Sequence, residues 1–125
     1  ILLLQPTSPL RTVEQVKEAI TLYRDDIDMV VSVMKSHAPA VLCNDNDDGF
    51  VNLVYNKHAG GRQSLPAFYE FNGAIYVINI ESLKSKGLGS FNKRIKYVMS
   101  KETSIDIDDI YDFMMVESIL HRKLK

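Results

Sequence analysis

Two aspartates near the end of the chain have the clearest potential for metal chemistry. They lie in the stretch Ser104 to Asp109, which reads SIDIDD. If the stretch is extended, Asp106 and Asp108 point to one face, because side chains alternate along an extended chain. Neighbouring carboxylates repel unless a cation or proton lies between them, and Mg²⁺ takes oxygen ligands beside phosphate oxygens. The spacing suits a metal and triphosphate site; the alternative is an acidic helix N-terminus, which the helix dipole favours.

A second candidate follows the apolar run Ile1 to Leu4. That run is apolar at every position, which predicts a strand covered on both faces. The stretch QPTSPLR, from Gln5 to Arg11, comes directly after it. Ligands of open α/β sheets bind beyond the carboxyl ends of strands, where Gln5 would offer a donor and an acceptor to a sugar or a base. The alternative is a proline-stiffened turn with an exposed Arg11.

The middle of the chain contributes a third candidate. Arg62 and Gln63 lie in a polar, glycine-containing segment, and Asn72-Gly73 follows. The planar guanidinium of Arg62 can bind a carboxylate or a phosphate through two parallel hydrogen bonds. A solvated loop charge is the alternative for Arg62, and a simple turn is the alternative for Asn72-Gly73.

The first third of the chain has the pattern of a strand, a helix and a second strand. Thr12 and Gln15 match a capping box at the start of a helix, and the apolar residues that follow, up to Tyr23, have helical spacing. The Val-rich run from Met29 to Met34 predicts a buried strand. We therefore expect a βαβ unit whose two strands are parallel and joined by a right-handed crossover.

The rest of the chain alternates between short elements. Residues 41–43 and 50–55 predict a hairpin with a polar tip, within a segment at about 39–70 that reads as an insertion into an α/β core. Further elements are expected as a strand at 74–80, a helix at 81–86 ended by Gly87, a strand at 95–99, and a last helix capped by Asp108 or Asp109.

Composition narrows the class of protein. The 125 residues are the size of one domain, and 46% of them are apolar. A net charge of -1, from 15 basic and 16 acidic residues, lacks the basic excess of a nucleic-acid-binding protein. No apolar run is long enough for a membrane span. Cys43 is the only cysteine, which fits the reducing cytoplasm, so we expect a cytoplasmic protein.

Four ordered blocks together resemble one enzyme family, the acylneuraminate cytidylyltransferases or CMP-sialic acid synthetases. The resemblance runs over nearly the whole chain, and four blocks in order are far more specific than any one. The blocks are LLQPTSPLR at 3–11, Arg62-Gln63 with Leu65-Pro66, NGAIY at 72–76 and SIDID at 104–108.

The resemblance implies a fold and an assembly. The fold would be α/β, part of a three-layer α/β/α Rossmann-like nucleotidyltransferase domain, with an inserted β-hairpin as a dimerisation arm at about 39–70. Residues 1–125 would form the C-terminal part of one such domain, and the enzyme would be a homodimer.

The resemblance also implies a reaction. CMP would pass from CTP to the anomeric hydroxyl of a sialic-acid-like nonulosonic acid, with release of pyrophosphate. Asp106 and Asp108 would be catalytic and would hold Mg²⁺, and Gln5 would contact the acceptor sugar. The other residues implied to line the sugar pocket are Arg62, a candidate partner for the sugar carboxylate, with Gln63, Asn72 and Tyr76.

Several positions depart from the family pattern. Val41 replaces an expected lysine, and Glu70-Phe71 precede Asn72 where an arginine is expected. A pair of phenylalanines expected near Gly89 and Ser90 is absent. These differences leave the sugar open, with legionaminic- or pseudaminic-type acids as options.

The family's phosphate-binding loop, rich in Gly, Arg, Ser and Lys, has no match in these 125 residues. We therefore expect the chain alone to be inactive with CTP, because positioning and charge stabilisation dominate phosphoryl transfer. The alternatives are another sugar nucleotidyltransferase, or a non-catalytic fragment that dimerises or binds sugar.

Overall fold

The computed structural model describes residues 1–45, 49, 51–54 and 66–123. The chain divides into two compact units, one made of Ile1–Met34 with Phe71–Lys125 and the other of Lys35–Glu70. Within the described residues, no helix has both the length and the apolar character that crossing a membrane requires.

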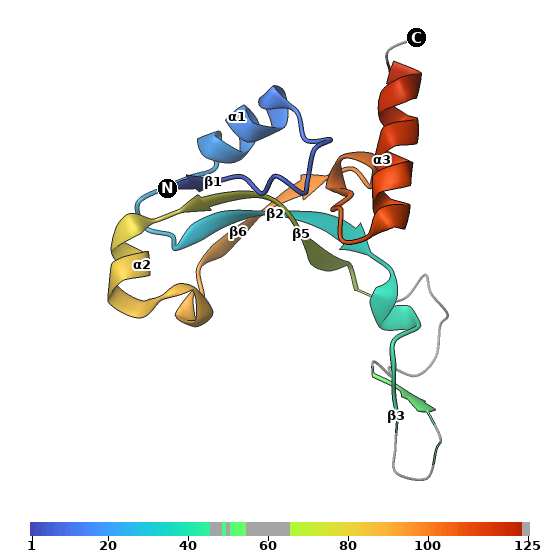
Figure 1. The fold of residues 1–125 in the computed structure, drawn as a ribbon. Coiled ribbons are helices and arrows are strands. Elements are labelled where there is room, and N and C mark those ends of the chain that lie inside the picture. The colour runs from blue at the N-terminus through green and yellow to red at the C-terminus, as the bar shows by residue number, and fades with distance from the viewer. Residues whose placement is uncertain (46–48, 50, 55–65, 124–125) are drawn as a thin grey trace. The chain divides into compact units, whose positions relative to one another are not determined.

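A four-stranded mixed sheet forms the centre of the first unit. Its strands are β1 (Leu2–Leu3), β2 (Met29–Ser36), β5 (Phe68–Ile78) and β6 (Arg94–Met99), in the order β1-β5-β2-β6 (Figure 1). β1 pairs antiparallel with β5, and β2 pairs parallel with β6 along six residues, from Met29 opposite Arg94 to Met34 opposite Met99. The protein is therefore of the α/β class.

The position of β1 corrects one expectation. β1 and β2 run in the same direction, as predicted, but β5 lies between them (Figure 1). Within the residues that the structure describes, β1 lies at one end of the sheet and pairs with β5 alone. Leu2 and Leu3 remain 43% and 45% exposed, so the prediction of a strand covered on both faces is wrong for this chain.

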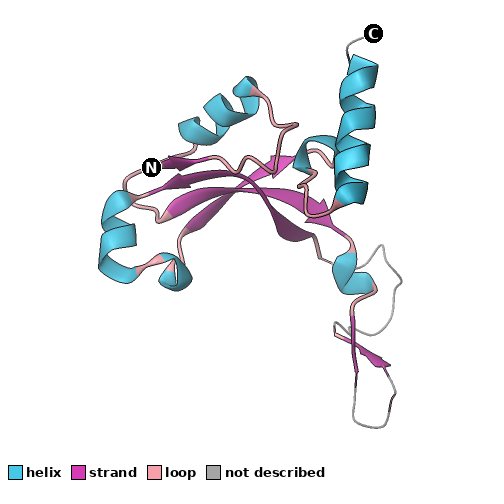
Figure 2. Ribbon diagram, viewed as in Figure 1, coloured by secondary structure: helices cyan, strands magenta, loops and turns pink. Residues whose placement is uncertain are grey.

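Helices cover both faces of the sheet, as Figure 2 shows. α1 (Val13–Thr21) begins with the predicted capping box, in which Thr12 and Gln15 bond each other's backbone. Its buried Ala19 packs in a cluster with Val30 of β2 and Ile75 of β5. Val31 and Val33 of β2 pack instead with Phe91 and, from α2 (Ile80–Lys86), with Leu83. Alternate residues of β2 thus face opposite layers.

α2 ends at Gly87, as predicted, and a short 3-10 helix, η3 (Leu88–Ser90), follows it. A second 3-10 helix, η4 (Glu102–Ser104), comes after β6. The last helix, α3 (Ile110–Lys123), is capped by Asp109, one of the two predicted residues, whose Oδ1 accepts from the backbone N–H groups of Tyr111 and Asp112. Among the described residues of α3, only Val116 is buried.

A buried charge joins β2 to the surrounding segments. Asp28 is 2% exposed and pairs with Nζ of Lys86 at 2.8 Å. Its carboxylate also accepts from the hydroxyl of Ser82 and from the backbone N–H groups of Asn92 and Lys93. These interactions, led by the bond from Lys86, hold the pKa of Asp28 well below its ordinary value.

The second unit contains the predicted hairpin. β3 (Cys43–Asp45) pairs antiparallel with β4 (Val51–Leu53), and a 3-10 helix, η1 (Ala38–Ala40), precedes them. Cys43 is exposed.

Candidate active site

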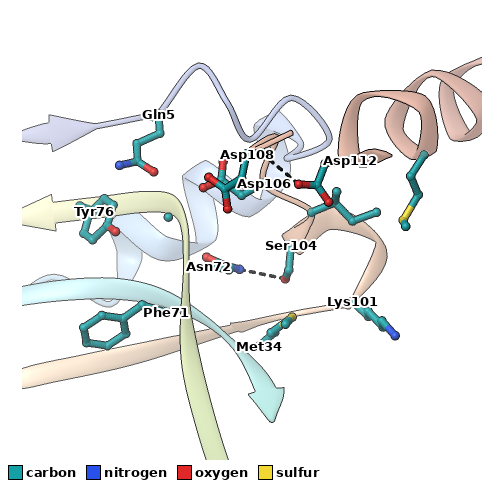
Figure 3. Close-up of a pocket in the computed structure, with 13 residues that line it drawn as sticks. Gln5, Met34, Phe71, Asn72, Tyr76, Lys101, Ser104, Asp106, Asp108 and Asp112 are labelled. Carbon is teal, nitrogen blue, oxygen red and sulfur yellow. Dashed lines mark hydrogen bonds between the residues drawn. The ribbon is translucent and has the colours of Figure 1, made fainter. Parts of the chain in front are cut away.

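A pocket of about 530 Å³ lies in the first unit, where several chain segments meet. Gln5 follows β1, Met34 lies near the end of β2, and Lys101 follows β6, so the pocket lies beyond the carboxyl ends of three strands. Ligands of α/β sheets bind in this position. The other lining residues are Phe71, Asn72, Gly73, Tyr76, Ser104, Ile105, Asp106, Asp108, Asp112 and Met115 (Figure 3).

The loop after β1 is fastened by its own arginine. The Arg11 guanidinium donates to the backbone carbonyls of Gln5 and of Ser8, the latter at 2.9 Å. The turns of the alternative form at residues 6–7 and 9–10, but Arg11 is half-buried, so the expectation of an exposed arginine is wrong. The arginine stabilises the bend that presents Gln5 to the pocket.

Two hydrogen bonds tie this loop to the aspartate segment. The buried hydroxyl of Ser8 donates to Oδ1 of Asp106 at 3.2 Å, and the backbone N–H of Ile107 donates to the carbonyl of Thr7 at 2.8 Å. Two blocks about 100 residues apart in the sequence therefore form one wall of the pocket.

Gly73 lies where the two blocks approach β5. Its φ of +73° falls in the left-handed region, which residues other than glycine rarely adopt. A Cβ here would collide with Oε1 of Gln5 and lie 3.3 Å from Oδ2 of Asp106. The missing side chain thus leaves space in which a glutamine oxygen and a carboxylate oxygen approach the same point.

Asn72 occupies the pocket wall with its amide fully engaged. Its Oδ1 accepts from the Ser32 hydroxyl at 2.6 Å and from the backbone N–H of Ala74, and its Nδ2 donates to Oγ of Ser104 at 2.8 Å. Asn72 is 6% exposed. One side chain therefore links β2, β5 and η4.

Asp106 and Asp108 both line the pocket, and Figure 3 shows them from the same segment. Ile105, which precedes Asp106, is extended, with a φ of -71° and a ψ of 122°. Asp112 fixes the far end of the segment, because Oδ2 of Asp112 accepts from the backbone N–H groups of Asp108 and Asp109.

These residues fit a hard divalent cation. Oδ1 of Asp106 is bonded to Ser8, whereas Oδ2 faces the space beside Gly73 and Gln5. Among the described residues, no three His, Cys, Asp or Glu side chains gather as a metal cage. Mg²⁺ takes carboxylate oxygens as ligands and usually keeps several water molecules beside phosphate oxygens.

Tyr76 completes the pocket from β5. Burial raises the pKa of its phenol, and the nearby negative charge of Asp106 adds to the effect. The phenol therefore stays protonated and can donate a hydrogen bond to a ligand.

Five of the seven predicted site residues line this one pocket: Gln5, Asn72, Tyr76, Asp106 and Asp108. Arg62 and Gln63 lie outside the described residues. Sequence reasoning missed Ser8, Ser104 and Asp112. The spacing of Asp109 and Asp112, as first and fourth residues of a helix start, was the available signal for Asp112.

No family model matches the chain. Among curated proteins, it is similar to the N-acylneuraminate cytidylyltransferase of Escherichia coli O18:K1:H7, at 36% identity over 97% of this chain and 30% of that protein. It is also 36% identical to the N-acylneuraminate cytidylyltransferase of Streptococcus agalactiae serotype V, over 91% of this chain and 28% of that protein. The chain thus spans less than a third of the length of these relatives.

Proposed function

We propose that this chain, which belongs to the acylneuraminate cytidylyltransferase family, forms part of an active site that transfers CMP from CTP to a nonulosonic acid. The observation that carries the proposal is the meeting of Gln5, Tyr76, Asp106 and Asp108 in one pocket. The family resemblance assigns these residues to the sugar and the metal, and they come from three separate blocks of the sequence.

The reaction is a displacement at phosphorus. The anomeric hydroxyl oxygen of the sugar attacks the α-phosphorus of CTP, the bond from that phosphorus to the pyrophosphate oxygen breaks, and the hydroxyl proton is released. Such reactions depend on positioning and on stabilisation of the charge at the phosphate oxygens.

The charge of the pocket explains why a cation is needed. The described lining has three carboxylates, of Asp106, Asp108 and Asp112, against one ammonium group, of Lys101. A triphosphate and an acidic sugar would be repelled by this surface without added positive charge. Asp106 and Asp108 would hold Mg²⁺, which when bound neutralises charge on the phosphates and the leaving pyrophosphate.

Gln5 and Tyr76, which line the same pocket, would bind the sugar. Gln5 offers an amide to its hydroxyl groups, and the protonated Tyr76 offers a donor. Phe71 adds an exposed ring to the same pocket. Arg62 is the proposed partner of the sugar carboxylate, with Gln63 beside it in sequence. The finer features implied by the family, a Rossmann-like domain and a homodimer joined through an arm at about 39–70, belong to the same proposal.

A pyrophosphate-release assay tests the function. The complete protein is incubated with CTP, Mg²⁺ and one of a panel of nonulosonic acids: N-acetylneuraminic, legionaminic and pseudaminic acid. We expect release with at least one sugar, and formation of its CMP conjugate by mass spectrometry. UTP, ATP and GTP are the matched controls. Absence of pyrophosphate with every sugar, or release without the CMP conjugate, refutes the proposal.

A further inference from the structure

We propose that Asn72 and Ser104 are positioning residues. Their buried hydrogen bonds hold the segment that carries Asp106 and Asp108 in place, and neither side chain contacts the sugar. The inference deepens the proposed function and rests on it for the role of the metal. The hydrogen bonds from which it is argued lie inside the fold and do not depend on the metal or the reaction.

The hydrogen-bonding capacity of Asn72 is directed inward. Its oxygen accepts two hydrogen bonds, from Ser32 and from the Ala74 backbone, and its nitrogen donates to Ser104. The nitrogen also lies 3.4 Å from the sulfur of Met99. A buried amide with these partners would have to break internal bonds to reach a ligand, and unsatisfied buried polar groups are costly.

Ser104 connects Asn72 to the segment that carries Asp106 and Asp108. Its hydroxyl accepts from Asn72 at 2.8 Å and donates to the carbonyl of Ser100 at 2.6 Å, which closes the turn containing η4. Ser104 is 6% exposed, and Asp106 follows two residues later. The start of the aspartate segment is therefore fixed to β5 by one side-chain contact.

The same link places the glycine that faces the carboxylate. Ser32 bonds both Asn72 and the backbone N–H of Ile75, at 2.6 and 2.7 Å, so β5 is held on each side of Gly73. Gly73 in turn approaches Gln5 and Asp106. The buried cluster of Ser32, Asn72 and Ser104 thus holds both the start of the aspartate segment and the part of β5 that faces Asp106.

Asn72→Ala and Ser104→Ala in the complete protein test the proposal. We expect each to weaken Mn²⁺ binding, measured by electron paramagnetic resonance of the free ion, by about 10-fold or more. The Mg²⁺ concentration for half-maximal turnover should rise similarly, while the sugar KM changes little. Amide exchange at Ile107, whose N–H bonds to Thr7, should become faster.

Asn79→Ala is the matched control. Asn79 is also a buried asparagine, but it caps α2 and donates to the carbonyl of Asp25, outside the pocket lining. Its loss should lower stability without changing Mn²⁺ affinity or exchange at Ile107. Both asparagines make internal hydrogen bonds, so either change should destabilise the protein. Only Asn72→Ala should also displace the segment that carries Asp106 and Asp108.

Two results would overturn the inference. One is a sugar KM that rises in Asn72→Ala while Mn²⁺ affinity and Ile107 exchange match the control, which would make Asn72 a sugar ligand. The other is unchanged exchange at Ile107 in both variants. Exchange is measured without substrates, so it decides the inference even if the wild type turns over no sugar or binds no Mn²⁺, whereas those two failures count against the proposed function.

Discussion

The hydroxyl of Ser8 donates a hydrogen bond to Oδ1 of Asp106 across 98 positions of sequence. This bond leaves Oδ2 as the carboxylate oxygen that faces Gln5 and Gly73. A serine within the loop after β1 therefore orients an aspartate that the family resemblance assigns to the metal.

Gly73→Ala should impair both stability and sugar binding. The positive φ disfavours alanine by about 1–2 kcal/mol, and the new methyl group would displace Gln5. We expect a lower free energy of unfolding in urea and a raised sugar KM. Gly87→Ala is the control, because Gly87 also has a positive φ, +70°, and nothing lies within 4 Å of the point that a Cβ would occupy there. Equal effects of the two changes on the sugar KM would contradict the claim that the new methyl group displaces Gln5.

Asp112→Ala should loosen the far end of the aspartate segment. It removes the acceptor of two backbone N–H groups at the start of α3, which should lower stability by about 1 kcal/mol. Because one of these groups belongs to Asp108, Mn²⁺ affinity should fall as well. Asn79→Ala, which removes the cap of α2, should cost similar stability and leave the affinity unchanged. If Mn²⁺ affinity is the same in both variants, Asp112 only stabilises the start of α3 and does not position Asp108.

Phe71→Ala should raise the sugar KM with little effect on folding. The ring is 60% exposed, so its removal costs little burial, but it lines the pocket. Tyr111→Ala is the control, because Tyr111 is 75% exposed and lies outside the pocket lining. A KM that changes equally in the two variants would show that Phe71 makes no contact with the sugar.

Asp28 should contribute to stability in a pH-dependent manner. Its pKa is lowered in the folded protein, chiefly by Lys86. Its contribution is therefore complete above the ordinary aspartate pKa and declines as the pH falls below that value. Urea unfolding at about pH 7 and about pH 3 should show a smaller loss of stability in Asp28→Asn than in wild type. Asp26→Asn removes only an exposed partner of Arg24, so this variant should lose as much stability between the two pH values as wild type does. An identical loss in Asp28→Asn would refute the assignment.

Local patterns predicted the elements well, and the family blocks predicted the pocket. The capping box at Thr12 and the stop at Gly87 depend on neighbouring residues, so the sequence contains them directly. The family blocks named Gln5 and Asp106, which the pocket brings together.

Contacts between distant segments could not be predicted. The insertion of β5 between β1 and β2, and the exposure of Leu2 in β1, depend on contacts between distant segments that no local pattern encodes. The bonds of Ser8 and Ser104 likewise join segments that meet only in the fold. Serine is common in loops, so its type and position gave no signal.

The central claim is that Asp106 and Asp108 hold the metal for CMP transfer. The direct test is the Mg²⁺-dependent turnover of CTP with the preferred nonulosonic acid by Asp106→Asn and Asp108→Asn in the complete protein. Each change keeps the shape of the side chain and removes its charge, so turnover should fall by about 100-fold or more while the folded state survives. Turnover equal to wild type in both variants would contradict the claim.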